Sequence, residues 1–201
     1  FPYSIKKVAE EMADVKVCSF RKAIEKYHIP IKDFGSNSAH LEELRGAHII
    51  FFNEKEAKYR VRFDIGHELG HMLFGHKMNL KESDPLYGVQ EVEANCFAAQ
   101  LLMPEQLLRE CSSRGHTIST NYIEKSFVVS DEAAGKRRST LAKTNYEWKS
   151  RAEKEYDDII IMRYANFLDK IAPRKFEVDY YDYDDERQLE RDSWLNNRSR
   201  W

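Results

Sequence analysis

Apolar side chains recur at spacings of three and four residues along much of the chain, which is the period of an amphipathic helix. Residues 59–73 carry such a stripe, and Gly75 behind them is a suitable C-cap. A second stripe runs over residues 89–103 and ends before Pro104, which interrupts a helix. The short apolar run His48–Phe52 consists of β-forming residues and predicts a strand.

Serines precede further helical patterns near both ends of the chain. Ser4 and Ser19 are placed to cap two helices near the N-terminus, and Ser130 is placed to cap a third. A more apolar helix is predicted around residues 159–171, whereas glycine and small polar residues indicate a loop over most of residues 31–47. The pattern as a whole therefore predicts a mainly helical chain with few strands.

These elements predict an α+β fold in which helices surround a small antiparallel sheet, followed by a helical C-terminal part. The character of the sequence changes near residue 115, so we expect a core over residues 1–115 and a C-terminal region over residues 116–201. The latter contains an acidic, aromatic tail over residues 177–186. A chain of 201 residues is long enough to bury a core without disulfides or metal.

Composition narrows the function classes. Apolar residues make up 42% of the chain and charged residues 33%, and the net charge of −2 provides no general attraction to nucleic acid or anionic membranes. No apolar run approaches the ~18 residues of a membrane span, and the first residues show no signal-peptide pattern. The three cysteines form no CxxC pair, so neither a disulfide framework nor a cysteine zinc site is expected, and a cytoplasmic location fits best.

Residues 67–71 form the sequence H-E-x-x-H inside the first helical stripe. Histidines four residues apart leave the same face of a helix, so both imidazoles can reach one zinc ion at about 2.0–2.1 Å. Glu68, beside the first histidine, is placed to hold the attacking water without binding the metal. The pattern predicts His67 and His71 as zinc ligands and Glu68 as the general base of a metal-assisted peptide hydrolysis.

A catalytic zinc site needs a third protein ligand and one open position. Glu91 and Glu93 on the next helix are the candidates, and because they lie two positions apart, only one of them can face the metal. Glu91 lies roughly 60° from the centre of the apolar face of that helix and Glu93 roughly 100°. We therefore expect Glu91 as the ligand, with Glu93 as the alternative, and Asn95 as a hydrogen-bond partner of a ligand.

His76 follows His71 by five residues, a spacing that does not fit the H-E-x-x-H-x-x-G-x-x-H pattern of metzincins. We expect it to be an exposed side chain at a helix C-terminus, where the helix dipole favours it, and not a ligand. The reaction also needs a donor to the developing oxyanion. Tyr87, His116 and Tyr122 each carry a suitable group, and no pattern favours one of them.

Two longer stretches together resemble the ImmA/IrrE family of metallopeptidases. They are RFDIGHELGHMLFGH over residues 62–76 and EVEANCFAAQLLMPE over residues 91–105. The strand and turn before the first stretch, and FVVSDEAAGKRR over residues 127–138, are similar to the family as well. The resemblance covers roughly residues 45–142.

The resemblance implies a gluzincin-like site in which zinc is held by His67, His71 and the glutamate three positions before an Ala-Asn pair, here Glu91, with Glu68 as the base. It also implies a site-specific endopeptidase of the cytoplasm that cleaves helix-turn-helix repressors. Such cleavage would derepress genes of mobile elements, prophages or a stress response. One departure is Asp64, one turn before Glu68, where the family often has threonine.

Non-catalytic regulatory modules are the alternatives. Residues 127–143 resemble a turn and a helix carrying Lys136, Arg137 and Arg138, a pattern that DNA-recognition helices share. Neighbouring acidic residues make direct DNA contact the less favoured interpretation. A second alternative is a protein-binding surface that the metal merely organises. The acidic tail, if it is not simply solvated, would dock on a basic partner or on its own domain.

Overall fold

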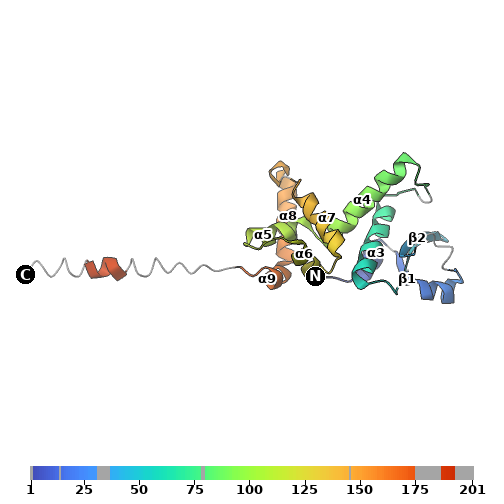
Figure 1. Ribbon diagram of the computed structural model, residues 1–201, viewed down its shortest axis with the longest axis horizontal. Coiled ribbons are helices and arrows are strands. Elements are labelled where there is room, and N and C mark those ends of the chain that lie inside the picture. The colour runs from blue at the N-terminus through green and yellow to red at the C-terminus, as the bar shows by residue number, and fades with distance from the viewer. Residues whose placement is uncertain are drawn as a thin grey trace, which may run out of the picture.

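The structure, a computed structural model, describes residues 2–13, 15–30, 37–77, 80–144, 146–174 and 187–192. Its first half contains α1 (Ile5–Ala13), β1 (Lys16–Ser19), α2 (Phe20–Lys22), η1 (Ala23–Tyr27), β2 (Ala39–Leu44), β3 (Ala47–Phe52), α3 (Lys58–Leu73) and α4 (Pro85–Leu102). Its second half contains α5 (Glu105–Ser113), α6 (Thr120–Phe127), α7 (Asp131–Leu141), η3 (Tyr146–Trp148), α8 (Arg151–Arg163) and α9 (Ala165–Ile171). The strands lie with α3 and α4 on one side of the molecule, and α5 to α9 gather on the other (Figure 1). The acidic tail predicted over residues 177–186 lies outside the described residues.

Both helical segments predicted near the N-terminus are present. α1 begins directly after Ser4, whose carbonyl accepts a hydrogen bond from the N–H of Val8. The side chain of Ser19 accepts a hydrogen bond from the N–H of Lys22 and so caps α2, as predicted. The helix continues as a π-helical turn, η1, and ends where His28 takes a left-handed conformation with φ of 54°.

The sheet has the strand order β1-β3-β2, with β3 parallel to β1 and antiparallel to β2. The fold class is α+β, as predicted, but the sheet is mixed and not purely antiparallel. β2 and β3 are joined by Arg45 and Gly46, whose φ angles of 53° and 77° are those of a tight hairpin turn. β1 is connected to β2 through α2 and η1, and a connection of that length allows either strand direction.

β2 occupies part of the segment that was expected to be a loop. Ala39 and Leu41 are buried in it, whereas His40 and Glu42, which alternate with them, are only half-buried. This alternation is the period-two signal of a strand with one buried face. The signal is present in the sequence, but the glycine and small polar residues that precede this strand favour a loop more strongly.

β3 is buried on both faces, which explains its uninterrupted apolar sequence. Ile50 and Phe52 belong to the main hydrophobic core, whereas Ile49 and Phe51 belong to a smaller cluster on the other face. The remaining buried members of that smaller cluster are Cys18, Phe20 and Ala23. The sheet is therefore covered by α1 and α3 on one side and by α2 and η1 on the other.

α3 and α4 pack closely against each other. α4 begins at Pro85, earlier than predicted, because the side chain of Asp84 accepts a hydrogen bond from the N–H of Leu86 and caps the helix. At the crossing, a Cβ atom on Gly70 would lie only 3.1 Å from the Cα of Ala94. A glycine is therefore needed on α3 at the point where the backbone of α4 comes nearest.

One of the predicted C-terminal helices begins at its predicted cap, and the other begins earlier than predicted. Ser130 caps α7 by accepting a hydrogen bond from the N–H of Ala133. The helix expected over residues 159–171 begins earlier, at a capping box formed by Ser150 and Glu153, and it is divided into α8 and α9.

The main core joins the two predicted regions. It contains Leu69 of α3, Leu107 of α5, Phe127 of α6 and Leu168 of α9, each of them fully buried. The boundary near residue 115 stays a prediction, and the parts on either side of it share this core. Among the helices of the described residues, none has the length and apolar character needed to cross a membrane.

Candidate metal centre

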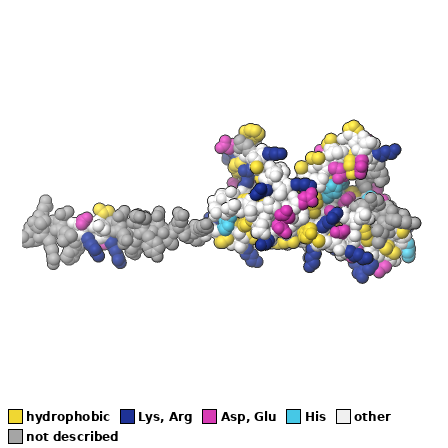
Figure 2. Space-filling view, in the orientation of Figure 1, with side chains coloured by type: hydrophobic (Ala, Val, Ile, Leu, Met, Phe, Trp, Pro, Cys, Tyr) yellow, Lys and Arg dark blue, Asp and Glu magenta, His cyan; other side chains and the backbone are white. Residues whose placement is uncertain are grey.

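α3 places the two histidines of the H-E-x-x-H sequence one turn apart and on the side facing α4. Their Nε2 atoms lie 2.9 Å apart. Glu91 of α4 faces both rings, with Oε1 3.3 Å from Nε2 of His71 and Oε2 3.5 Å from Nε2 of His67. The structure therefore brings together the three residues predicted as ligands. Histidine and acidic side chains meet below the protruding end of α4 in Figure 2.

The donor atoms of this group, and the distances between them, suit a divalent metal ion. Two imidazole nitrogens and a carboxylate oxygen form one of the ligand sets of catalytic zinc. Bonds of about 2.0–2.1 Å in a tetrahedral arrangement separate ligand atoms by about 3.3 Å, close to the 2.9, 3.3 and 3.5 Å found here. The described residues thus contain a His67, His71 and Glu91 group that could hold a metal ion.

Burial keeps both histidines in the neutral form that metals bind. Burial lowers the pKa of His67, although Glu91 and a hydrogen bond with Asn95 act in the opposite direction. Burial also lowers the pKa of His71, with smaller contributions from its histidine neighbours, to about 4. Both rings are therefore uncharged near pH 7, with lone pairs available. The contact of Asn95 with a ligand was predicted from its spacing.

Glu68 lies on α3 beside His67 and next to the outer strand β2. Its pKa is raised to about 7, chiefly by burial and further by the charges of Glu91 and Asp64, while a backbone hydrogen bond from Leu41 acts against the rise. A general base works best when its pKa lies near the pH of the reaction. The unusual Asp64 is therefore coupled electrostatically to the predicted base and makes its proton harder to remove.

Glu93 and His76 do not join the group of donor atoms. Glu93 is 54% exposed and points to His76, with its Oε2 atom 3.1 Å from Nε2 of that ring. The prediction that His76 is exposed is wrong, because only 4% of its side chain is accessible. Its Nδ1 lies 2.9 Å from Nδ1 of His71, on the side of that ring away from Glu91.

A family model described as the IrrE N-terminal-like domain of the peptidase M78 family matches residues 20–139. The chain belongs to this family. The match extends from α2 through β2, β3 and the metal centre into α7, and so includes the motif stretches over residues 62–76, 91–105 and 127–138. No curated protein matches the chain. Membership of the ImmA/IrrE family supports a metallopeptidase-like function in general terms.

Two of the three groups considered as oxyanion donors serve the packing of the C-terminal helices. The hydroxyl of Tyr122 donates to the carbonyl of Ile171, and Nε2 of His116 lies 3.2 Å from the carbonyl of Pro173. Tyr87 instead lies one turn before Glu91 on α4, and the charge of Glu91 raises its pKa. Of the three, Tyr87 is the one associated with the metal centre.

Arg137, the middle residue of the basic stretch of α7, is buried, whereas Lys136 and Arg138 on either side of it are exposed. The guanidinium of Arg137 is buried, with 7% of the residue accessible, and donates to the carbonyl of Met103 and to the side chain of Gln100. The ammonium of Lys136 lies 2.6 Å from the carboxylate of Glu132 on the same helix. Arg137 therefore holds α7 against the end of α4 instead of contacting a ligand.

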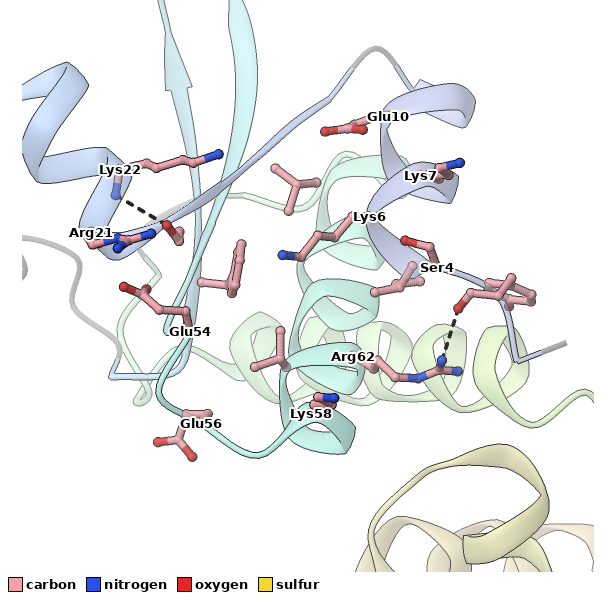
Figure 3. A pocket seen from close by; sticks show the side chains of 16 residues that line it. Ser4, Lys6, Lys7, Glu10, Arg21, Lys22, Glu54, Glu56, Lys58 and Arg62 are labelled. Atoms are coloured by element: carbon pink, nitrogen blue, oxygen red, sulfur yellow. Dashed lines mark hydrogen bonds between the residues drawn. The ribbon is translucent and has the colours of Figure 1, made fainter.

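A pocket of about 790 Å³ opens between α1, β1 and the start of α3, away from the metal centre (Figure 3). Lys6, Lys22 and Arg62 line it together with Glu54. The ammonium of Lys6 lies 3.8 Å from the centre of the Phe52 ring, so a cation–π contact already occupies part of the wall. None of the residues lining this pocket belongs to the metal centre.

Proposed function

We propose that this chain is a zinc-dependent, site-specific endopeptidase of the cytoplasm. The observation that carries the proposal is the convergence of two neutral histidines and Glu91 beside Glu68, a carboxylate with a pKa of about 7. Helix packing alone does not require two histidines and two acidic side chains to meet in this way. Burying these polar side chains costs desolvation energy, which a bound cation would offset. Such a cluster of groups with shifted pKa values is typical of a functional site.

The residues of the centre have distinct tasks in this proposal. His67, His71 and Glu91 would hold zinc, which, when bound, lowers the pKa of a water molecule and polarises the scissile carbonyl. Glu68 takes the proton of the attacking water on its carboxylate and passes it to the nitrogen of the leaving amine. The bond between the water oxygen and the carbonyl carbon forms, and the C–N bond of the peptide then breaks. Because Glu68 passes its proton to the amine, its carboxylate is unprotonated again at the end.

The outer strand supports binding of an extended substrate. β2 is one of the two edge strands of the described sheet, and the backbone of its residue Leu41 is hydrogen-bonded to Glu68. A peptide segment that adds to this strand would pass the predicted base in an extended conformation. Recognition of this kind favours a narrow range of substrates, so a general substrate such as casein is a poor probe.

We further propose that the substrate is a helix-turn-helix repressor whose cleavage derepresses mobile-element, prophage or stress-response genes. This part rests on the family. It accounts for a peptidase centre in a chain whose net charge of −2 provides no general attraction to DNA, because the regulator that is cleaved supplies the DNA contact.

The test compares new protein N-termini in cells that express the wild type, Glu68→Gln, or the control Glu25→Gln on the exposed surface of η1. We expect new N-termini in a helix-turn-helix regulator with the wild type and the control, and none with Glu68→Gln, although all three purified proteins hold about one zinc. Equal cleavage by Glu68→Gln would refute the peptidase. Cleavage confined to other protein classes would refute the repressor substrate.

Metal content separates the peptidase from the regulatory-module alternative. Purified wild type is expected to hold zinc, and Glu91→Ala is expected to lose it. A wild type that takes up no metal after reloading would favour a non-catalytic module over the proposed enzyme.

A further inference from the structure

The end of α3 forms a turn that folds the chain back on the last ligand. Gly75 has a φ of 64°, and its N–H donates to the carbonyl of Met72. The N–H of His76 then donates to the carbonyl of His71 at 2.9 Å. This pair of hydrogen bonds is the Schellman motif, in which the residue after the glycine contacts the residue five positions earlier.

In most Schellman motifs that contact is between two apolar side chains. Here it is between two imidazoles, with Nδ1 of His76 2.9 Å from Nδ1 of His71. Phe74 covers the outer ring, its centre lying 5.5 Å from that of His76, and Phe97 of α4 packs edge-on against Phe74. The His76 ring is therefore held in place by packing as well as by the backbone turn.

The two distances allow one distribution of protons when His71 binds a metal through Nε2. The proton of the His71 ring is then on Nδ1, which donates to Nδ1 of His76. Nδ1 of His76 accepts, so its own proton is on Nε2, which lies 3.1 Å from Oε2 of Glu93. The carboxylate of Glu93 is the final acceptor, so both ring N–H groups of this His71–His76–Glu93 series have an acceptor.

We propose that His76 and Glu93 are positioning residues that set the tautomer and the ring orientation of His71. The proposal rests on the metal centre of the proposed function and adds two residues to it. It also gives separate roles to the two glutamates of α4. Glu91 faces the Nε2 side of His71, and Glu93 is reached through His76 from the Nδ1 side.

The loss of such an outer partner typically weakens metal binding 10- to 100-fold. We therefore expect His76→Phe, which keeps an aromatic ring but removes the acceptor, to bind zinc about 10- to 100-fold more weakly than the wild type. His76→Asn offers an oxygen near the position of Nδ1 and should recover most of the affinity. Glu93→Ala should show a smaller loss in the same direction.

The experiment measures the zinc affinity of the full chain by competition with a chelator, with the exposed Lys77→Ala as the control. The second readout is the ring N–H proton of His71 in NMR spectra of the zinc-loaded proteins. A hydrogen-bonded Nδ1–H signal should be present in the wild type and in His76→Asn and absent in His76→Phe. Urea unfolding of the zinc-free proteins checks that each variant is folded.

The outcomes separate this inference from the function on which it rests. If the wild type binds zinc and His76→Phe binds it equally well with an unchanged N–H signal, the positioning role is refuted and the metal centre stands. If His76→Asn is as weak as His76→Phe although both are folded, an acceptor at the position of Nδ1 does not restore the affinity, and the proposed hydrogen bond is refuted. If the wild type binds no zinc, both proposals fail.

Discussion

Gly70 precedes His71 on α3 and faces α4, so it offers a sharp test of the packing that builds the candidate site. A Cβ atom at this position would lie 3.1 Å from Cα of Ala94, 3.2 Å from Cδ1 of Phe97 and 3.3 Å from the carbonyl oxygen of Ala94. Carbon atoms in contact prefer about 3.5–4.0 Å. Two of the three neighbours are backbone atoms, so α4 itself must move by a few tenths of an ångström to admit alanine.

Gly66, one turn earlier on the same helix, is the matched control. Its added Cβ would lie 3.5 Å from the Cβ of Ala98, which is an ordinary contact. Both substitutions gain about 1 kcal/mol of helix propensity, so their difference isolates the effect of the clash. Overpacking of this kind costs about 1–3 kcal/mol, and Gly70→Ala should be less stable than Gly66→Ala by about that amount.

The clash should also reach the metal centre. Ala94 lies on α4 one turn after Glu91, which faces His67 and His71 at 3.3–3.5 Å. Metal sites tolerate errors of about 0.2 Å in ligand distance. A displacement of α4 should therefore weaken zinc binding by about tenfold, equivalent to about 1.4 kcal/mol, in Gly70→Ala but not in Gly66→Ala.

The assay is urea unfolding of both variants and the wild type with zinc chelated, followed by a chelator competition for zinc. Equal urea slopes would show that the difference lies in stability. If Gly70→Ala proves as stable as Gly66→Ala and binds zinc as tightly, the close approach of α3 and α4 is not present in solution, and the reasoning is wrong.

Three further predictions concern a proton, a buried cation and the metal. The pKa of Glu68 is raised from 4.5 to about 7 in the folded protein. The stabilisation of the folded state by the protonated Glu68 carboxyl is therefore complete below pH 4.5 and is lost as the pH rises through 7. Between pH 5 and pH 8, the free energy of unfolding of zinc-free Glu68→Gln should therefore rise by about 2 kcal/mol relative to that of the zinc-free wild type, as measured by urea unfolding. A difference that does not change with pH would contradict the buried carboxyl. Arg137→Leu should destabilise the fold by about 2 kcal/mol because it leaves buried acceptors unpaired, whereas the exposed Arg138→Leu should stay within about 0.5 kcal/mol, and equal effects in thermal unfolding would refute the buried role. Zinc at 100 times its dissociation constant should stabilise the wild type by about 2.7 kcal/mol in calorimetry, and Glu91→Ala should lose most of this gain at the same zinc concentration. An equal gain in both proteins would refute Glu91 as the third ligand.

Much of the candidate site follows from local periodicity. Residues four apart share a helix face whatever the rest of the fold, so the pairing of His67 with His71 could be predicted from spacing alone. The same angular argument placed Glu91 nearer than Glu93 to the buried seam of α4, and it is Glu91 that faces the histidines. Serine caps are local as well, because the hydrogen bond is made within three residues.

His76 shows where a local signal was present and was interpreted differently. A glycine followed by a histidine at a helix end is compatible with an exposed side chain and also with a Schellman turn. The turn places the ring against His71, and the packing of Phe74 and Phe97 then buries it. The first step depends on residues close in the sequence, but burial depends on α4.

The direction of β1 and the pKa of Glu68 were decided by the tertiary structure alone. An alternating or apolar strand pattern is the same for parallel and antiparallel neighbours, so it carries no information on direction. The pKa of Glu68 depends on burial and on Leu41, Asp64 and Glu91, of which Leu41 and Glu91 come from other elements. The sequence by itself determined which side chains could bind a metal and on which helix faces they lie, because those properties repeat every turn. Only the packing of α3 against β2 and α4 decided how far apart the donor atoms are and how tightly each proton is held, because distance and desolvation arise between elements.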